Sequence, residues 1–287
     1  MFRTLLFIPG NNKRFIDKAK SLNADIICFD LEDSVPLNEK QTAREFVSEA
    51  LDKNEDYGDR NVYVRINSYE SGMVFHDLDA IVSDGIDGVV VPKVNNEKEV
   101  SSLALRLTEL ERRKAMSKKM GIMASIESAQ GVINSYSIAM ADLRVKMLIF
   151  GVFDFLNDMG LDYVQDGIEY SFARAKIPID ARAVGIGAID AIWQKVDDIE
   201  GLVRDAVTAK RLGYRGKCVI HPNQLEPVTN VFFPSRIEIE WARKVVQALE
   251  ETMEKGKGIG AVTVDGRMVD AAHYRQAKSV LNSLNSS

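Results

Sequence analysis

The sequence predicts a TIM (β/α)8 barrel followed by a C-terminal helical extension. Short apolar runs alternate with longer stretches of helical periodicity along most of the 287 residues. This repeated order is typical of a parallel sheet covered by helices. About eight such units occur, a number that favours closure into a barrel over an open sheet. The chain length is also normal for one such barrel, so it does not require two catalytic domains.

The expected strands are short, apolar and rich in β-branched residues. They cover residues 4–8, 25–31, 61–66, 88–92, 121–126, 146–151, 188–193 and 217–221. Residues 89–91 are apolar on both faces, as a parallel strand covered on both sides requires. The seventh strand has the weakest pattern. Between the strands, helical spacing predicts helices over 12–22, 38–55, 74–84, 97–114, 130–142, 166–185 and 198–212.

A barrel domain is expected over residues 1–234, with a C-terminal helical extension over 235–287 rather than a separate domain. Ser235 and Glu238 have the spacing of a capping box at the start of a long helix. That helix is expected over 235–254, followed by a flexible stretch at 255–260, a hairpin arm at 261–266 and a last helix at 270–284. The extension exceeds the needs of a barrel, so we expect it to act as a lid or an oligomer arm.

Composition narrows the function classes. Hydrophobic residues make up 46% of the chain and the net charge is −5, so nucleic acid is a poor partner. No signal peptide and no apolar run of about 20 residues is present, which predicts no membrane partner. Cys28 and Cys218 lie inside apolar runs and are expected to be small buried hydrophobes. A reducing, cytoplasmic setting is the simplest location.

Arg65, Glu127 and Asp154 each follow a predicted strand, where ligands bind in a parallel barrel. Glu127 and Asp154 follow adjacent strands, and two carboxylates with remaining waters suit Mg²⁺. The rigid fork of Arg65 matches a carboxylate or an enolate-like oxygen. The alternatives are a surface acid at a helix start for Glu127, a helix N-cap for Asp154, and a barrel-mouth salt bridge for Arg65.

Three more acids, Asp30, Glu32 and Asp33, crowd the end of the second strand. Like charges this close need a metal, a cation or protonation. We expect them to hold the waters of the metal or the guanidinium of Arg65. The alternative is that they are loop acids that also cap the next helix.

Basic residues at the same ends are candidates for anion binding. Lys13 and Arg14 open the first predicted helix, where backbone N–H groups favour phosphate, and a solvated cationic face is the alternative. Lys93 fits an anion-binding or structural role better than a Schiff base. His221 fits a hydrogen-bonded scaffold better than a base. The chain has no Walker motif and no GxGxxG between strand and helix, which disfavours ATP and NAD.

Eight short motifs in order resemble the citrate lyase β-subunit-like group of the HpcH/HpaI aldolase superfamily, which includes malyl-CoA and citramalyl-CoA lyases. They are LLFIPGN (5–11), FDLEDSV (29–35), VRINS (64–68), VVVPKV (89–94), IESAQG (126–131), FGVFDF (150–155), IHPNQ (220–224) and VDGRMVD (264–270). No single string is specific, but eight in order over nearly the whole chain are.

The resemblance implies a TIM barrel with Mg²⁺, or Mn²⁺ in its place, held by Glu127 and Asp154. It places Arg65 at the substrate oxygens and CoA along the barrel mouth, with Lys13 and Arg14 as candidate phosphate contacts. Phe153, beside the metal ligand, stands where members of the family usually carry Glu. This departure affects the expected substrate preference more than the metal.

The resemblance also implies a homo-oligomer, a trimer or hexamer, in which the C-terminal lid covers the site of a neighbouring subunit. Asp270 matches the acid that this lid supplies. From the sequence alone, Asp270 would be a helix N-cap, and both roles stay open.

The expected function is a Mg²⁺-dependent acyl-CoA lyase that works by a reversible Claisen-type step. It would cleave a 3-hydroxy-3-carboxyacyl-CoA, either malyl-CoA or citramalyl-CoA, to acetyl-CoA plus glyoxylate or pyruvate. One alternative is the β subunit of a citrate lyase complex, which yields an acetyl thioester and oxaloacetate. The other is a catalytically silent CoA-binding barrel.

Overall fold

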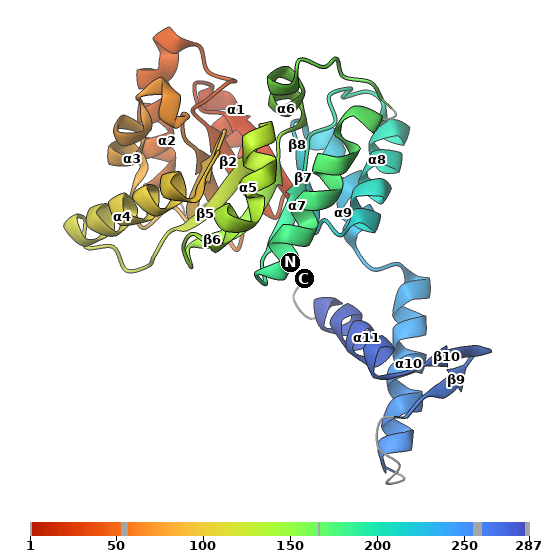
Figure 1. Cartoon of the computed structure of the whole chain (residues 1–287). Coiled ribbons are helices and arrows are strands. Elements are labelled where there is room, and N and C mark those ends of the chain that lie inside the picture. Colours follow the sequence, from red (N-terminus) through yellow and green to blue (C-terminus); the bar gives the residue numbers. More distant parts are fainter. Residues whose placement is uncertain (1, 53–56, 166, 255–259, 285–287) are drawn as a thin grey trace. The chain divides into compact units, whose positions relative to one another are not determined.

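A computed structural model describes residues 2–52, 57–165, 167–254 and 260–284. In these residues eight parallel strands close into one barrel in sequence order, and the last pairs with the first (Figure 1). The predicted TIM barrel is therefore confirmed. The strands are β1 (Thr4–Pro9), β2 (Ile26–Asp30), β3 (Asn61–Arg65), β4 (Gly88–Val91), β5 (Gly121–Ile126), β6 (Val145–Phe150), β7 (Gly187–Asp190) and β8 (Gly216–Val219).

Helices follow the strands and surround the barrel (Figure 1). They are α1 (Lys13–Ala19), α2 (Lys40–Leu51), α3 (Val74–Ile81), α4 (Glu97–Arg113), α5 (Ala129–Met140), α6 (Val152–Met159), α7 (Ser171–Ala183), α8 (Ile199–Leu212) and α9 (Leu225–Phe232). Short 3-10 turns precede or separate some of them: η1 (Leu37–Glu39), η3 (Tyr69–Ser71), η4 (Ile168–Tyr170) and η5 (Pro222–Gln224). The sequence did not predict α6 and α9, which have eight residues each.

Two apolar layers build the barrel domain because successive side chains of a strand point to opposite faces. One layer fills the barrel interior and includes Leu5, Ile26, Met123 and both cysteines. The other lies between strands and helices. Cys28 and Cys218 are free and buried, as predicted, and burial raises the pKa of each thiol.

The seventh strand ends at Asp190, earlier than the predicted residue 193. A buried ion cluster lies where β7 and β8 face α7 and α8. Arg174 and Lys217 both donate to Asp190, at 2.7 and 2.6 Å. The same two cations also pair with Asp205. Because each charge has oppositely charged partners, removing any one of them would leave an unpaired buried charge, so this cluster belongs to the scaffold of the barrel.

The described residues divide into two compact units, Phe2–Phe232 and the part from Phe233 onward. The second unit contains α10 (Arg236–Glu254), the hairpin β9 (Val262–Val264) and β10 (Arg267–Val269), and α11 (Ala271–Leu284). The predicted capping box is present, since Ser235 N–H donates to Glu238 and Glu238 N–H to Ser235 Oγ.

A small apolar core of its own holds this second unit together. It joins Val245 and Leu249 of α10 to Val264, Val269 and Ala277. The flexible stretch expected at 255–260 lies, except for Gly260, outside the described residues. The role of the unit as a lid stays a prediction. In the described ranges, no helix of either unit is both long and apolar enough to cross a membrane.

Candidate active site

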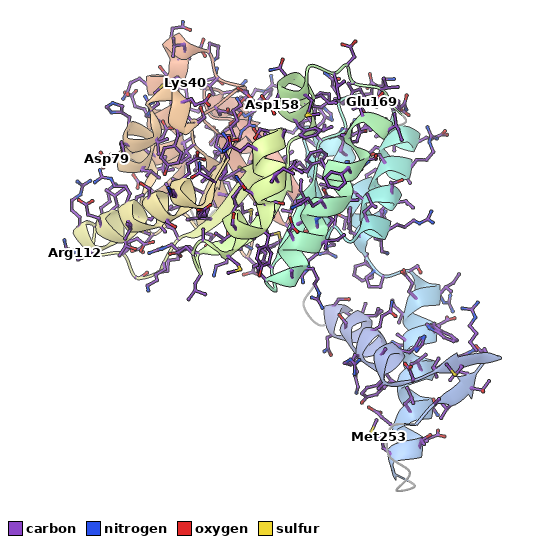
Figure 2. The ribbon with its side chains drawn as sticks, viewed as in Figure 1. Lys40, Asp79, Arg112, Asp158, Glu169 and Met253 are labelled. Atoms are coloured by element: carbon purple, nitrogen blue, oxygen red, sulfur yellow. The ribbon has the colours of Figure 1, made fainter. Side chains whose placement is uncertain are left out.

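Arg65, Glu127 and Asp154 line one cavity of about 80 Å³ at the carboxyl ends of the strands. Arg65 is the last residue of β3, Glu127 follows β5, and Asp154 lies in the first turn of α6. Phe7 and Phe153 also line this cavity. Figure 2 labels Lys40, Asp158 and Glu169 along this edge of the barrel. The structure thus brings the three predicted residues together, while their chemical roles stay predictions.

Arg65 is held by Asp30 through two parallel hydrogen bonds, each 2.6 Å long. Its guanidinium carbon also lies 4.6 Å from the centre of the Phe7 ring. Burial raises the pKa of Asp30, but Arg65 and the bonds from Ser34 and Glu32 outweigh it and hold the pKa below its usual value. The mouth salt bridge considered from the sequence exists, and it fixes the orientation of Arg65 toward the cavity.

Glu32 and Lys93 form a second ion pair at the mouth, with Nζ 2.7 Å from Oε1 of Glu32. Lys93 Nζ also lies 3.5 Å from Asp33 and 3.5 Å from Asp154. Oε2 of Glu32 is buried and 3.3 Å from Arg65, but it accepts no hydrogen bond in the described part of the chain. Burial therefore leaves the pKa of Glu32 raised.

The charge state of Lys93 decides between its predicted roles. Burial lowers the pKa of Lys93, but Glu32, Asp154 and Asp33 outweigh it and raise the pKa above its ordinary value. A Schiff base needs a neutral amine. The structure therefore favours the structural or anion-binding role for Lys93.

Glu127 is buried, with 6% of its surface exposed, so it is not the surface acid considered as an alternative. Ser128 caps α5 instead. Burial first, then the negative charges of Glu32 and Asp154, raise the pKa of Glu127 to about 8. Asp154 is not an N-cap either, because Gly151 occupies that position of α6.

This donor set fits a hydrated divalent cation. Two carboxylates face one cavity, and Oε2 of Glu32 is a buried acceptor without a hydrogen bond among the described residues. A cation here would offset the burial and like-charge repulsion that raise the pKa of Glu127. No group of three or more His, Cys, Asp or Glu side chains forms a complete metal cage in the described residues. Mg²⁺ suits such a site because it keeps several waters.

Gly151 is the point where α6 approaches Glu127. A β carbon at this position would lie 2.5 Å from Cγ of Glu127, closer than real contacts allow. Gly151→Ala is therefore expected to displace the Glu127 carboxylate, to weaken Mg²⁺ binding about tenfold, and to cost about 1–3 kcal/mol of stability. Calorimetric Mg²⁺ titration and thermal unfolding measure both effects. Gly260→Ala is the matched control because its β carbon would meet open space; equal behaviour of the two variants would contradict the prediction.

Lys13 and Arg14 open α1 and are exposed, as expected for phosphate contacts or a solvated face. Lys13 already pairs with Glu49 at 2.9 Å. His221 is half-buried, and its Nδ1 accepts a hydrogen bond from the backbone N–H of Asn223, which supports the scaffold role.

A second cavity, which the sequence did not predict, lies beside α1. Its volume is about 210 Å³, and its mostly apolar lining includes Phe7, Phe15, Leu22, Ile220 and Pro222. Two of the motifs, LLFIPGN and IHPNQ, supply part of its lining, but no local pattern shows that β1 with α1 and the loop after β8 meet at one cavity.

Asp270 caps α11 in the second unit. Its Oδ1 accepts from Ala272 N–H at 2.9 Å and contacts Nδ1 of His273 at 2.8 Å. The bond with His273 is the main cause that lowers the pKa of Asp270. The N-cap role inferred from the sequence alone is thus present, and the catalytic role stays a prediction.

Comparisons with known proteins extend over the whole chain. A model of the HpcH/HpaI aldolase/citrate lyase family matches residues 3–222. The citrate lyase subunit beta of Leuconostoc mesenteroides subsp. cremoris is 38% identical over 286 residues, which cover 99% of this chain and 93% of that protein. The (3S)-malyl-CoA thioesterase of Cereibacter sphaeroides is 34% identical, covering 98% and 93%. The mitochondrial citramalyl-CoA lyase of Homo sapiens is 31% identical, covering 97% and 84%.

A solved structure has a similar fold. The protein CitE from Mycobacterium tuberculosis, in complex with magnesium, acetoacetate and coenzyme A, is 26% identical to this chain. The match has a TM-score of 0.78 and covers 98% of this chain and 97% of that one. The similarity therefore includes the extension as well as the barrel.

Proposed function

Because the chain belongs to the HpcH/HpaI aldolase/citrate lyase family of carbon–carbon lyases, we propose that it is a Mg²⁺-dependent acyl-CoA lyase. Its substrate would be malyl-CoA or citramalyl-CoA, cleaved to acetyl-CoA and glyoxylate or pyruvate. The observation that carries the proposal is the convergence of Arg65, Glu127 and Asp154 on one cavity.

Each residue has a role set by its chemistry. Glu127 and Asp154 would hold the cation, which when bound supplies Lewis-acid polarisation of substrate oxygens. During cleavage the 3-hydroxyl group would give its proton to solvent as its carbon becomes the keto carbon. The electrons of the broken C–C bond pass to the thioester, which becomes an enolate. Arg65, already oriented by Asp30, would stabilise the enolate oxygen.

CoA would bind along the barrel mouth, next to the keto-acid site. The mostly apolar cavity beside α1 supports this placement, because part of its lining comes from α1, the helix that begins with Lys13 and Arg14. Lys13 would exchange its exposed partner Glu49 for a phosphate. Such an exposed pair contributes little to stability, so the exchange costs little.

The enolate carbon must gain a proton, and Asp270 is the proposed donor, supplied by a neighbouring subunit of a trimer or hexamer. Asp270→Asn is expected to reduce solvent deuterium exchange into acetyl-CoA by about 10²-fold or more, as for loss of a general acid–base group. Asn is also a good N-cap, so α11 should stay folded. The exposed variant Glu240→Gln on α10 is the control. Normal exchange in Asp270→Asn would remove Asp270 from the mechanism.

A citrate lyase β subunit is the second candidate, favoured by the 38% identity to that protein. It would act on a citryl thioester within a complex. Its partner subunits would then be required for activity.

A cleavage assay with malyl-, citramalyl- and citryl-CoA, with and without EDTA, tests the proposal. We expect the chain alone to release acetyl-CoA and a keto acid from malyl- or citramalyl-CoA, and EDTA to stop the reaction. Turnover of citryl-CoA, with no turnover of malyl-CoA or citramalyl-CoA, would support the citrate lyase role. Release of free CoA without a keto acid would indicate a thioesterase. CoA binding without turnover of any thioester would contradict the lyase proposal and support the alternative of a catalytically silent CoA-binding barrel.

A further inference from the structure

Lys93 has an unusual backbone for its residue type. It follows β4 with a φ of +55°, in the left-handed region. A residue with a β carbon is strained there and stays there only where its surroundings hold it. Three carboxylates surround its ammonium, at 2.7 Å for Glu32 and 3.5 Å for Asp33 and Asp154. The strained backbone thus places the ammonium group of Lys93 among three carboxylates.

These acids come from opposite sides of the mouth. Glu32 lies in the loop after β2 and is 6% exposed on its side chain, whereas Asp154 belongs to α6 after β6 and is 40% exposed. Lys93 is the cation within ion-pair distance of Asp154 among the described residues. Lys93 therefore bridges the loop after β2 and the first turn of α6, whose acids would otherwise repel each other and Glu127.

We propose that Lys93 is a positioning residue for the metal site: an internal counter-ion that holds Asp154 and Glu32 in place and gives up Asp154 when Mg²⁺ binds. The inference rests on the proposed metal pair Glu127 and Asp154. An ammonium 3.5 Å from a ligand carboxylate competes with a divalent cation for the same oxygens and repels it. Lys93 consequently weakens Mg²⁺ binding while it orders the empty site.

Isothermal titration of the full chain with MgCl2 at pH 8.5 tests this role. Lys93→Met and Lys93→Gly are expected to bind Mg²⁺ about tenfold more tightly than the wild type, because the competing cation is gone. Glycine accepts the left-handed backbone without strain, so Lys93→Gly should fold even where the Met variant does not. Lys93→Arg keeps the charge and should stay near the wild-type affinity.

The control variant is Lys146→Met, which removes an exposed lysine of β6 whose Nζ bonds the Leu143 carbonyl. Its Mg²⁺ affinity should not change. A larger Mg²⁺-induced rise in Tm for Lys93→Gly than for the wild type gives a second readout.

Unchanged or weaker Mg²⁺ binding in the Met and Gly variants would overturn the counter-ion role, and so would an Arg variant that behaves like them. The proposed function fails separately, if the wild type itself binds no Mg²⁺ or if Glu127→Ala binds it normally.

Discussion

Glu127→Gln is expected to reduce Mg²⁺-dependent turnover by about 10³-fold. The substitution keeps the size of the side chain but removes one of the two carboxylates that face the cavity. Lewis-acid polarisation contributes several kcal/mol to the transition state, and each ~1.4 kcal/mol corresponds to a factor of ten in rate. Steady-state rates across a Mg²⁺ series, with EDTA as the zero point, measure the loss.

The same variant lowers turnover, but without bound metal it should raise the free energy of unfolding. Burial, with Glu32 and Asp154, raises the pKa of Glu127 to about 8 from an ordinary value of 4.5. The folded state thus binds more protons than the unfolded state in this window, and stability falls as the pH rises through it. The amide of the Glu127→Gln variant cannot ionise, so the variant should be more stable than the metal-free wild type at about pH 8 and equal to it near pH 4.

Glu200→Gln, which changes an exposed glutamate in the first turn of α8, is the matched control. It should alter neither the rate nor the slope of stability with pH. Turnover in Glu127→Gln that remains high and sensitive to EDTA would show that the metal is held elsewhere.

Arg65→Met is expected to lower both activity and stability. Loss of one preorganised donor to a developing oxyanion costs about 10²–10³-fold in rate. The variant also leaves Asp30, whose side chain is 1% exposed, without the partner that makes two bonds to it. Breaking a buried pair from one side costs about 3–5 kcal/mol. Chemical denaturation and steady-state kinetics measure the two losses.

Low pH should narrow the stability difference between Arg65→Met and the wild type. In the wild type Arg65 outweighs burial and holds the pKa of Asp30 below its usual value, so this stability is present at neutral pH and is lost as the pH falls through that lowered pKa. In the variant burial acts without Arg65, so protonation of Asp30 relieves the penalty.

A double variant separates the two effects of Arg65. Arg65→Met combined with Asp30→Asn should recover much of the stability and none of the activity. Full activity in Arg65→Met would contradict the proposal that Arg65 stabilises the enolate oxygen. A stability difference that does not change with pH would show that Asp30 is not the source of the loss.

The barrel could be predicted because its strands and most helices carry local patterns. Apolar runs gave the eight strands to within three residues at each end, and Ser235 with Glu238 marked the start of α10. The helices α6 and α9 were not predicted; they begin shortly after β6 and β8, at Val152 and Leu225. Strand β7 was extended too far, because the apolar residues after Asp190 continue the pattern outside the sheet.

The site was predictable only as a set of residue types at strand ends. The sequence indicated that Arg65, Glu127 and Asp154 would meet, because parallel strand ends share one face of a barrel. It did not indicate which acid pairs with which cation. Asp30 with Arg65, and Glu32 with Lys93, are separated by 35 and 61 residues, respectively, and depend on side-chain directions that no local pattern encodes.

By itself the sequence determined the fold class, the presence of the extension and the residue types at the strand ends, because periodicity and strand-end residues are local properties. Tertiary structure decided the rest. It buried Glu127 among other acids, brought Gly151 against it, and forced Lys93 into a left-handed backbone between Glu32 and Asp154. These features depend on distances between separate loops, and only the closed barrel sets those distances.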